Sequence, residues 1–276
     1  ISEFGLFFPP NPTEKNSFIG GNIACNSSGS RTFKYGTVRD YVLELTVILP
    51  WGEEITLTRD SNSVVDNEFV IKTPSGKKIQ FPLTEIKYPR LKKNSAGYYI
   101  RNGMHTLDLF VGSEGTLGTI VESKLRLLRK PEKVFGAIIF SDVLDKAFDF
   151  VETIRKESYD SFANKENTSS TISARLIEYF DKNSLDLLRN DYSQIPSEAM
   201  CAVWIEQEYS ESEESLLLQN WYDYIARYTE LADSTWVATN DAEHEKFREF
   251  RHRLPLRVFE IVARSRFNKI GSDTAV

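Results

Sequence analysis

Cysteine and histidine are scarce in this chain of 276 residues, which has two cysteines and three histidines. Cys25 and Cys201 lie far apart without a CxxC pair, which excludes a thiolate metal cluster and favours a reducing compartment. His105, His244 and His252 show neither HxH nor HxxxH spacing. We therefore expect no metal site.

Long apolar runs are also absent, since no segment approaches the roughly 20 consecutive apolar residues that a membrane-spanning helix needs. Basic charge is not in excess either: 34 lysines and arginines stand against 40 aspartates and glutamates, a net charge of -6. Nucleic acids and anionic membrane surfaces both attract a basic face, so neither suits this chain. We expect small-molecule ligands and a cytoplasmic protein, with peripheral attachment to a membrane left open.

The pattern of predicted secondary structure changes near residues 128–133. Before that point, alternating apolar positions predict strands at 41–50 and 52–58 and a hairpin around Pro74 to Gly76. After it, strand and helix alternate as far as a charged helix at about 241–263, which predicts an α+β or α/β second half. The first helix of that half, which begins near residue 141, has one apolar face. The face is formed by Leu144, Ala147, Phe148, Val151 and Ile154.

Two glycine clusters stand out. The first, GGNIACNSSGSRTFKYGTVRD at 20–40, contains little apolar material, and its glycines would let the main chain approach a ligand closely. The second, LFVGSEGTLGTIVESKLRLL at 109–128, spaces Gly112, Gly115 and Gly118 by three. It matches neither the GxGxxG of a dinucleotide-binding turn nor the Gly-Lys-Ser/Thr of a Walker loop. Taken alone, glycines in such a pattern are more often turn residues than parts of a ligand site.

Together the clusters resemble the FAD-linked oxidases of the vanillyl-alcohol oxidase superfamily, and within it the glycolate oxidase and D-lactate dehydrogenase group. PPNPT at 9–13 resembles the Pro-Asp-Pro-Ser element of that family. TWVATNDAEHEKFREFRHRLP at 235–255 and KIGSDTAV at 269–276 resemble its substrate-domain stretch. The resemblance implies an α+β fold, with the second part of a PCMH-type FAD-binding domain at 1–130 and the first part of a ferredoxin-like α+β cap domain at 131–276.

Complete members of the family carry a further subdomain in front and a His-rich stretch behind. The resemblance therefore implies a fragment whose catalytic residues lie outside this sequence and which, alone, binds FAD weakly. It implies an FAD-dependent oxidoreductase, a flavoprotein that oxidises a 2-hydroxy acid of the glycolate or D-lactate type by hydride transfer to a non-covalently bound flavin. The electron acceptor is open among oxygen, a quinone, a cytochrome and an iron-sulfur subunit. Two alternatives are a flavin transferase similar to alkyl-glycerone-phosphate synthase and a truncated, cofactor-free module without activity.

The resemblance also places the cofactor contacts, because the family's contacts to the flavin and its phosphates can be carried over to matching positions. The first loop supplies Pro12, Thr13, Gly20, Gly21, Asn22, Asn26 and Gly29. The second loop supplies Glu114, Gly115, Gly118 and Ile120. Main-chain amides in such loops are natural anion ligands.

Two further features of the first loop are given structural interpretations. Cys25 stands where the family commonly has threonine, and we interpret it as a small packed residue, because free cysteine is usually buried. Arg39 and Asp40 are adjacent opposite charges after a Gly-Thr turn. We predict an ion pair between them that fixes the loop.

Substrate-binding residues are implied in the second half. By resemblance Arg251 and Lys269 match positions that bind the substrate carboxylate, for which a guanidinium is well shaped. Arg248, Arg251 and Pro255 are expected on a common side of their helix. The structural alternative, left open, is a solvated basic face balanced by neighbouring acids. Those acids are Glu243, Glu245 and Glu249.

Overall fold

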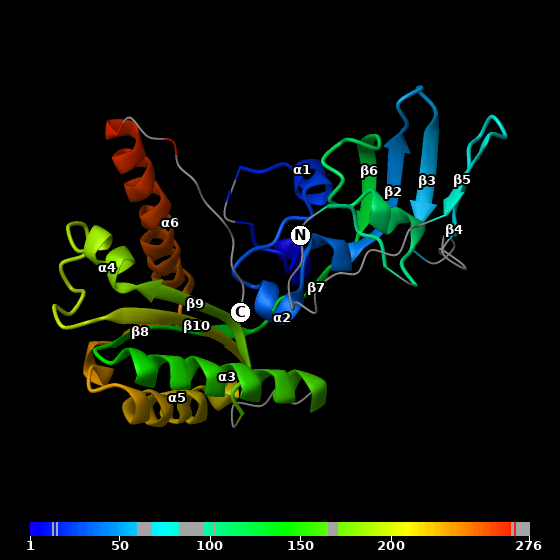
Figure 1. The fold of residues 1–276 in the computed structure, drawn as a ribbon. Helices are drawn as coiled ribbons and strands as arrows, with labels where there is room; N and C mark the ends of the chain where they lie inside the picture. The colour runs from blue at the N-terminus through cyan, green and yellow to red at the C-terminus, as the bar shows by residue number, and fades with distance from the viewer. Residues whose placement is uncertain are drawn as a thin grey trace. The chain divides into compact units, whose positions relative to one another are not determined.

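The structure, a computed structural model, describes residues 1–12, 14, 16–59, 68–82, 97–101, 103–164, 171–265 and 268 (Figure 1). Thr13, Lys269 and the predicted terminal stretch at 269–276 lie outside the described residues. The chain divides into two compact units, Ile1–Arg129 and a second unit that begins at Lys130. The assignment of the two parts to a flavin domain and a cap domain stays a prediction.

The first unit is built around a three-stranded antiparallel sheet in the order β3-β2-β6. Its strands are β2 (Val42–Ile48), β3 (Glu54–Thr58) and β6 (Thr119–Leu125). In β3 the buried Ile55 and Leu57 alternate with exposed residues, as expected of a strand with one face on a core. That core continues through Leu45 and Val47 of β2 to Ile23 and Leu107, all fully buried.

The predicted hairpin around Pro74 to Gly76 is confirmed. Strands β4 (Glu68–Lys72) and β5 (Lys78–Pro82) pair antiparallel, and Gly76 adopts a φ of 84° at the turn. Glycine suits this position because a Cβ disfavours positive φ. The shorter elements of the unit are η1 (Ser2–Phe4), β1 (Leu6–Phe7), α1 (Ile19–Ala24), α2 (Thr32–Tyr35), η2 (Val38–Tyr41), η3 (Thr106–Leu109) and β7 (Leu128–Arg129).

The second unit is a four-stranded antiparallel sheet in the order β11-β8-β10-β9. Its strands are β8 (Lys133–Ser141), β9 (Ala174–Asp181), β10 (Cys201–Tyr209) and β11 (Trp236–Ala238). Numbered within the unit, this order is 4-1-3-2, that of a ferredoxin-like sheet. The predicted α+β fold class is confirmed.

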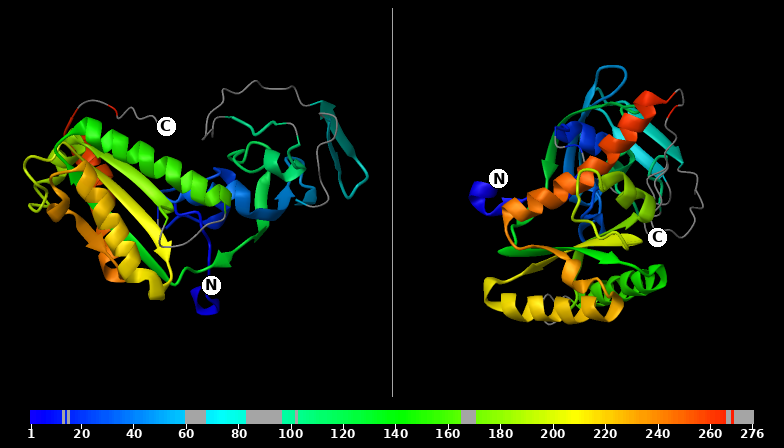
Figure 2. Two further views of the ribbon diagram at one scale, coloured as in Figure 1. Left: turned by 90° about the horizontal axis from the view of Figure 1, so that it is seen from below. Right: turned by 90° about the vertical axis from the view of Figure 1, so that its left-hand side faces the viewer.

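Helices cover both faces of this sheet, as the right-hand view of Figure 2 shows. Helices α3 (Leu144–Asn164) and α5 (Glu214–Tyr228) pack on one face, against Phe135, Ala137 and Ile139 of β8. Helices α4 (Lys182–Leu188) and α6 (Asp241–Arg264) pack on the other, against Ile138 and Phe140. Alternate residues of a strand face opposite ways, so β8 is buried on both sides. The described part of the unit also contains the short 3-10 helices η4 (Glu211–Glu213) and η5 (Ala232–Ser234).

The predicted apolar face of α3 is partly wrong. Phe150 is buried, whereas Phe148 is 51% exposed and packs its ring against Tyr179 on β9. The buried stripe continues instead through two serines, Ser158 and Ser161. The hydroxyl of Ser158 accepts a hydrogen bond from the amide of Ala174 and donates to the carbonyl of Ile154, which satisfies a polar group inside the core. A search for apolar side chains alone cannot find such a stripe.

Helix α6 agrees closely with the helix predicted at about 241–263. It begins after Asn240, whose side chain accepts a hydrogen bond from the amide of Glu243 at 3.1 Å, an N-cap. Pro255 lies inside the helix. Proline has no amide hydrogen, so the carbonyl of Arg251, four residues earlier, loses its usual helical partner.

Candidate functional site

The two glycine clusters meet in the first unit. The amide of Gly112 donates to the carbonyl of Ile23 at 3.0 Å, and the amide of Glu114 donates to the carbonyl of Ala24 at 2.9 Å. Both carbonyls belong to α1, the helix that carries Gly20 and Gly21. The predicted cofactor residues of the two loops are therefore brought together through main-chain hydrogen bonds.

Backbone strain is concentrated at this junction. Among the described residues that are not glycine, only Asn26 (φ 45°) and Glu114 (φ 52°) have a positive φ. Asn26 ends the first loop's helical segment, and Glu114 is the residue whose amide reaches α1. For a residue such as glutamate this conformation costs about 1–2 kcal/mol. Strain of this kind persists only where the surroundings hold it, and it is commonest at functional sites.

A buried arginine ties the junction together. Arg39 is 9% exposed, and its guanidinium donates to the carbonyl of Asp108 and, at 2.6 Å, to the carbonyl of Val111. Its amide donates to the side chain of Asn26 at 2.9 Å. Burial lowers the pKa of the Arg39 guanidinium, and the nearby Asp108 carboxylate opposes that shift. One residue thus holds both the strained Asn26 and the segment just before Gly112.

The predicted ion pair between Arg39 and Asp40 is wrong. The carboxylate of Asp40 accepts a hydrogen bond from the amide of Thr37 at 2.8 Å and caps η2. Arg39 instead shares the carboxylate of Asp108 with Arg59, which lies 3.1 Å from it. A carboxylate brought in by the fold, 69 positions along the chain, replaces the sequence neighbour as the partner.

The predicted cofactor glycines fall into two groups. A Cβ placed on Gly29 would lie 1.9 Å from the carbonyl oxygen of Asn11, and one on Gly118 would lie 2.8 Å from that of Ile48. These two glycines allow main chains to pack closely inside the unit. At Gly20, Gly21 and Gly115 no atom lies within 4 Å of such a Cβ. On the side where a Cβ would lie, no protein atom blocks these three positions, and this leaves room for a ligand.

The other predicted cofactor residues have partners inside the unit. Asn22 is buried, donates to the hydroxyl of Ser17 and accepts from that of Ser27, so it braces the first loop. Ile120 pairs with Val47 in the sheet and packs on the core. Pro12 is half-buried. Cys25 is exposed, because it lies at the C-terminal end of α1, so our interpretation of it as a packed residue is wrong.

In the second unit, Arg251 projects from α6 toward β9. Its Nε donates to Oε2 of Glu178 at 3.2 Å, and 29% of the arginine side chain is exposed. Burial raises the pKa of the Glu178 carboxyl, an effect that Arg251 opposes and Glu206 reinforces. Arg248 does not share this partner, since its guanidinium contacts Glu245, three residues earlier. Lys269 lies outside the described residues.

Beside this pair lies a buried ionic network that the sequence analysis missed. Arg175 contacts Glu206 at 2.7 Å and Glu208 at 3.3 Å, and all three side chains are at most 9% exposed. His244 of α6 lies 3.2 Å from Glu206 and 3.0 Å from the carbonyl of Val134. A register shift in the β9–β10 pairing makes Arg175 an extra residue in β9, and this brings it to Glu206. The signal in the sequence was EQE at the end of an otherwise apolar strand.

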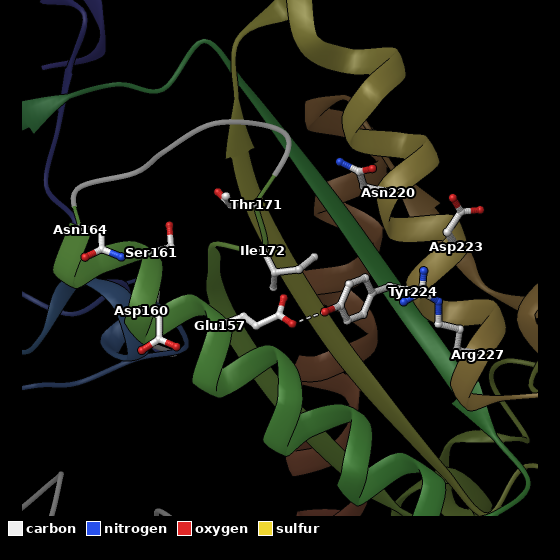
Figure 3. A pocket seen from close by; sticks show the side chains of 10 residues that line it. All are labelled: Glu157, Asp160, Ser161, Asn164, Thr171, Ile172, Asn220, Asp223, Tyr224 and Arg227. Carbon is white, nitrogen blue, oxygen red and sulfur yellow. Dashed lines mark hydrogen bonds between the residues drawn. The ribbon is translucent and has the colours of Figure 1, made fainter.

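A pocket of about 430 Å³ opens on the opposite side of the same sheet, between α3 and α5 (Figure 3). Its polar lining includes Asp160, Asp223 and a hydrogen bond from the hydroxyl of Tyr224 to Glu157. Burial, reinforced by that bond to Glu157, raises the pKa of Tyr224. Arg251 belongs to α6, on the other face. The pocket is therefore separate from the predicted substrate position.

The described residues show neither a metal-binding cluster nor a membrane-spanning helix. Among them, no cluster of three or more His, Cys, Asp or Glu side chains is arranged to hold a metal ion. Nor does any helix of the described ranges combine the length and apolar character needed to cross a bilayer.

Known proteins resemble this chain in both sequence and fold. Residues 1–58 match the family described as FAD binding domain. D-lactate dehydrogenase of Anaerostipes hadrus is 30% identical over 211 residues, which cover 69% of this chain and 37% of that protein. Glycolate oxidase subunit GlcD of Bacillus subtilis is 32% identical over 211 residues, covering 75% of this chain and 34% of the relative.

A solved structure of alkyldihydroxyacetonephosphate synthase aligns with a TM-score of 0.53 and 17% identity, covering 91% of this chain and 41% of that one. At that identity the likeness concerns the fold alone. The chain spans roughly a third of the length of the curated relatives quoted above. These matches confirm the resemblance noted in the sequence and support FAD as the cofactor. The chain therefore resembles the FAD-linked oxidases in sequence, and its first 58 residues match the FAD binding domain family.

Proposed function

We propose that this protein is an FAD-dependent oxidoreductase that oxidises a 2-hydroxy acid of the glycolate or D-lactate type. The observation that carries the proposal is the junction of the two glycine loops, where Gly20, Gly21 and Gly115 have empty space beside them. The strained residues Asn26 and Glu114 lie at the same junction, and Arg39 bonds to Asn26. The names of the sequence relatives, D-lactate dehydrogenase and glycolate oxidase, give the substrate class.

In this proposal the main chain around Gly20, Gly21, Glu114 and Gly115 holds the cofactor. The three glycines fit because their amides can approach a phosphate or a flavin edge without side chains in the way. The amide of Glu114 is bonded to the carbonyl of Ala24, so Glu114 contributes by fixing the loop that carries Gly115. When bound, FAD accepts the hydride from the α-carbon of the substrate. The hydroxyl proton passes to a base that we do not place among the described residues. Asn22, Asn26, Gly29, Gly118 and Ile120 shape the loops that present those amides.

Arg251 is the proposed contact to the substrate carboxylate. Its side chain is part-exposed, and only its Nε has a hydrogen-bond partner among the described residues. The two terminal nitrogens of a guanidinium match the two oxygens of a carboxylate, so they orient the acid as well as bind it. Lys269 is proposed as the second cation on the strength of the family resemblance alone.

The proposal also covers the electron acceptor and the location of the protein. The reduced flavin passes its electrons to an acceptor, and an iron-sulfur subunit is one of the four classes proposed from the sequence. We propose a cytoplasmic protein with peripheral membrane association left open.

The test is anaerobic mixing of the flavin-loaded protein, at its natural full length, with D-lactate or glycolate. The expected result is bleaching of the flavin band near ~450 nm, followed by turnover with a dye acceptor. A flavin that stays oxidised with both acids would overturn the proposal. Acid precipitation should release the flavin into the supernatant, since the binding is proposed to be non-covalent.

Arg251 is tested separately by substitution. Arg251→Met should lower kcat/KM by roughly thirtyfold to several thousandfold, because losing a buried charged partner costs about 2–5 kcal/mol. Arg251→Lys keeps the charge without the fork and should fall in between. Arg248→Met is the matched control, since Arg248 pairs with Glu245 instead. An Arg251→Met enzyme within threefold of wild type would remove Arg251 from the site.

A second candidate is an ether-forming flavin transferase. It is favoured by the solved structures of alkyldihydroxyacetonephosphate synthase that share the fold. The sequence relatives weigh against it, because they are dehydrogenases and an oxidase at 30% identity or more. Bleaching by simple 2-hydroxy acids with dye turnover would exclude the transferase.

A further inference from the structure

We propose that Glu178 is a positioning residue for Arg251: it holds the Nε of the guanidinium so that the two terminal nitrogens stay available to the substrate carboxylate. The inference rests on the proposed function, because it assigns a purpose to Arg251 in the same site. It names a residue of β9 that neither the family resemblance nor the sequence pattern singled out.

Four arginines of α6 form ion pairs, and Arg251 uses its guanidinium differently from the others. Arg253 and Arg257 both engage Asp191 and Glu260 through Nε and both terminal nitrogens. Arg248 contacts Glu245 through Nε and one terminal nitrogen. Arg251, among the described residues, is bonded through Nε alone.

That single bond lies at the inner end of the guanidinium. Nε is the nitrogen next to the aliphatic stem, and the two terminal nitrogens form the opposite edge of the planar group. A carboxylate at Nε therefore fixes the plane of the guanidinium without occupying the edge that binds a second carboxylate end-on. Arg253 and Arg257 instead each bind Asp191 through two N–H groups, the geometry that gives an arginine–carboxylate pair its greatest strength.

Glu178 is itself held rigidly enough to serve this purpose. It lies opposite Trp204 in the β9–β10 pairing, with 22% of its side chain exposed. Its neighbours on the same face of β9, Leu176 and Phe180, are buried in the core under α6. The ring of Phe180 lies 5.3 Å from that of Phe250, the residue before Arg251. Both ends of the contact are thus anchored by the same apolar packing.

The charges around the pair agree with a positioning role. The carboxylate of Glu178 offsets part of the charge of Arg251, so the orientation of the guanidinium matters more to a substrate carboxylate than bare attraction does. Glu206 is already engaged by Arg175 and His244. Glu178 is the acid that acts directly on Arg251.

The experiment compares Glu178→Ala, Glu178→Gln and Arg251→Met, with D-lactate as substrate and a dye acceptor, in the flavin-loaded protein at its natural full length. Glu178→Ala removes the acceptor for Nε and should raise KM roughly tenfold to a hundredfold, the range expected for one hydrogen bond to a charged group. Its kcat should change by less than about threefold. Glu178→Gln keeps an oxygen acceptor of the same shape and should hold KM within about threefold.

A double variant separates positioning from general damage. Because Glu178 acts through Arg251, Glu178→Ala should change KM by less than about twofold when Arg251→Met is already present. Glu245→Ala, which removes the partner of Arg248 on the same helix, is the matched control and should leave KM unchanged. Flavin content and melting temperature are measured for every variant. If Glu178→Ala does not fold, Glu178→Asp, which withdraws the carboxylate by one methylene, should raise KM in its place.

The outcomes distinguish this inference from the proposed function. If Arg251→Met leaves KM unchanged, the carboxylate-binding role of Arg251 fails, and the positioning role fails with it. If Arg251→Met raises KM but Glu178→Ala does not, the positioning role alone is overturned. Equal increases in KM from Glu178→Ala with and without Arg251 would also overturn it, because Glu178 would then act independently.

Discussion

The two units build their candidate sites from different materials. In the first unit, the site consists of main chain in loops, and side chains such as Arg39 serve to hold that main chain in strained positions. In the second unit, the site consists of charged side chains on a regular sheet and helix, and the main chain around Arg251 and Glu178 is conventional apart from Pro255. In the first unit, steric clashes should therefore account for most of the effect of a substitution on stability. In the second unit, changes of charge should account for most of it.

The largest effect is expected from removing the central charge of the buried network in the second unit. Arg175→Met leaves the carboxylates of Glu206 and Glu208 without their cation in the core and should lower the free energy of unfolding by about 3–5 kcal/mol. Urea denaturation measures the loss. Lys182→Met, which breaks an exposed pair with Asp186, should cost less than about 1 kcal/mol. Equal losses in the two variants would contradict the view that buried charge dominates this unit.

In the first unit, the corresponding effect should be steric. Gly118→Ala would place a Cβ 2.6 Å from the side chain of Val47 and 2.8 Å from the carbonyl of Ile48. Overpacking of this kind costs about 1–3 kcal/mol, which thermal unfolding can measure. A variant as stable as wild type would mean that β2 yields easily, and the role of Gly118 in close packing would be lost.

Local patterns in the sequence predicted helices and strands, whereas contacts between residues far apart in the chain could not be predicted from it. The charged run at about 241–263 and the turn residues from Pro74 to Gly76 are local signals, and each predicted an element that the structure has. The partner of Arg39 could not be read from its neighbours, because Asp108 arrives from another segment. The site residues came from resemblance, which supplied Arg251 but not Glu178, since their contact depends on how α6 packs on β9.

A substitution at Gly20 should have two smaller effects of opposite sign, a gain in stability and a loss of FAD affinity. Gly20 is helical and has no atom within 4 Å of a Cβ position, so Gly20→Ala should stabilise the fold by about 0.5–1 kcal/mol. The added methyl group should weaken FAD binding if the main chain there contacts the cofactor. Melting temperature and flavin titration test the two effects separately. Unchanged FAD affinity would remove Gly20 from the proposed cofactor contacts.

The smallest effect concerns acid stability of the first unit. Glu53 accepts hydrogen bonds from the amide of Ser75 at 3.1 Å and the indole of Trp51 at 2.5 Å, and bonds from Ser75 and Trp51 lower its pKa from 4.5 to about 2. A lowered pKa in the folded state means that this stabilisation is present above pH 4.5 and is lost as the pH falls toward 2. Glu53→Gln should therefore flatten the dependence of unfolding free energy on pH in that window. A slope identical to wild type would show that these bonds do not persist in solution.

The strand order of the second unit also bears on the time course of folding. Strand β10 lies between β8 and β9, so the first two strands to be synthesised meet their common partner only when Cys201–Tyr209 is available. Until then, the segment from Lys133 to Met200 can form α3 and α4 locally but has no completed ladder among these strands. Distant pairings of this kind slow folding, because the intervening chain must be ordered before the pairing is gained. During synthesis, β8 and β9 therefore have no strand between them until β10 arrives, and the other edge of β8 is covered later still, by β11.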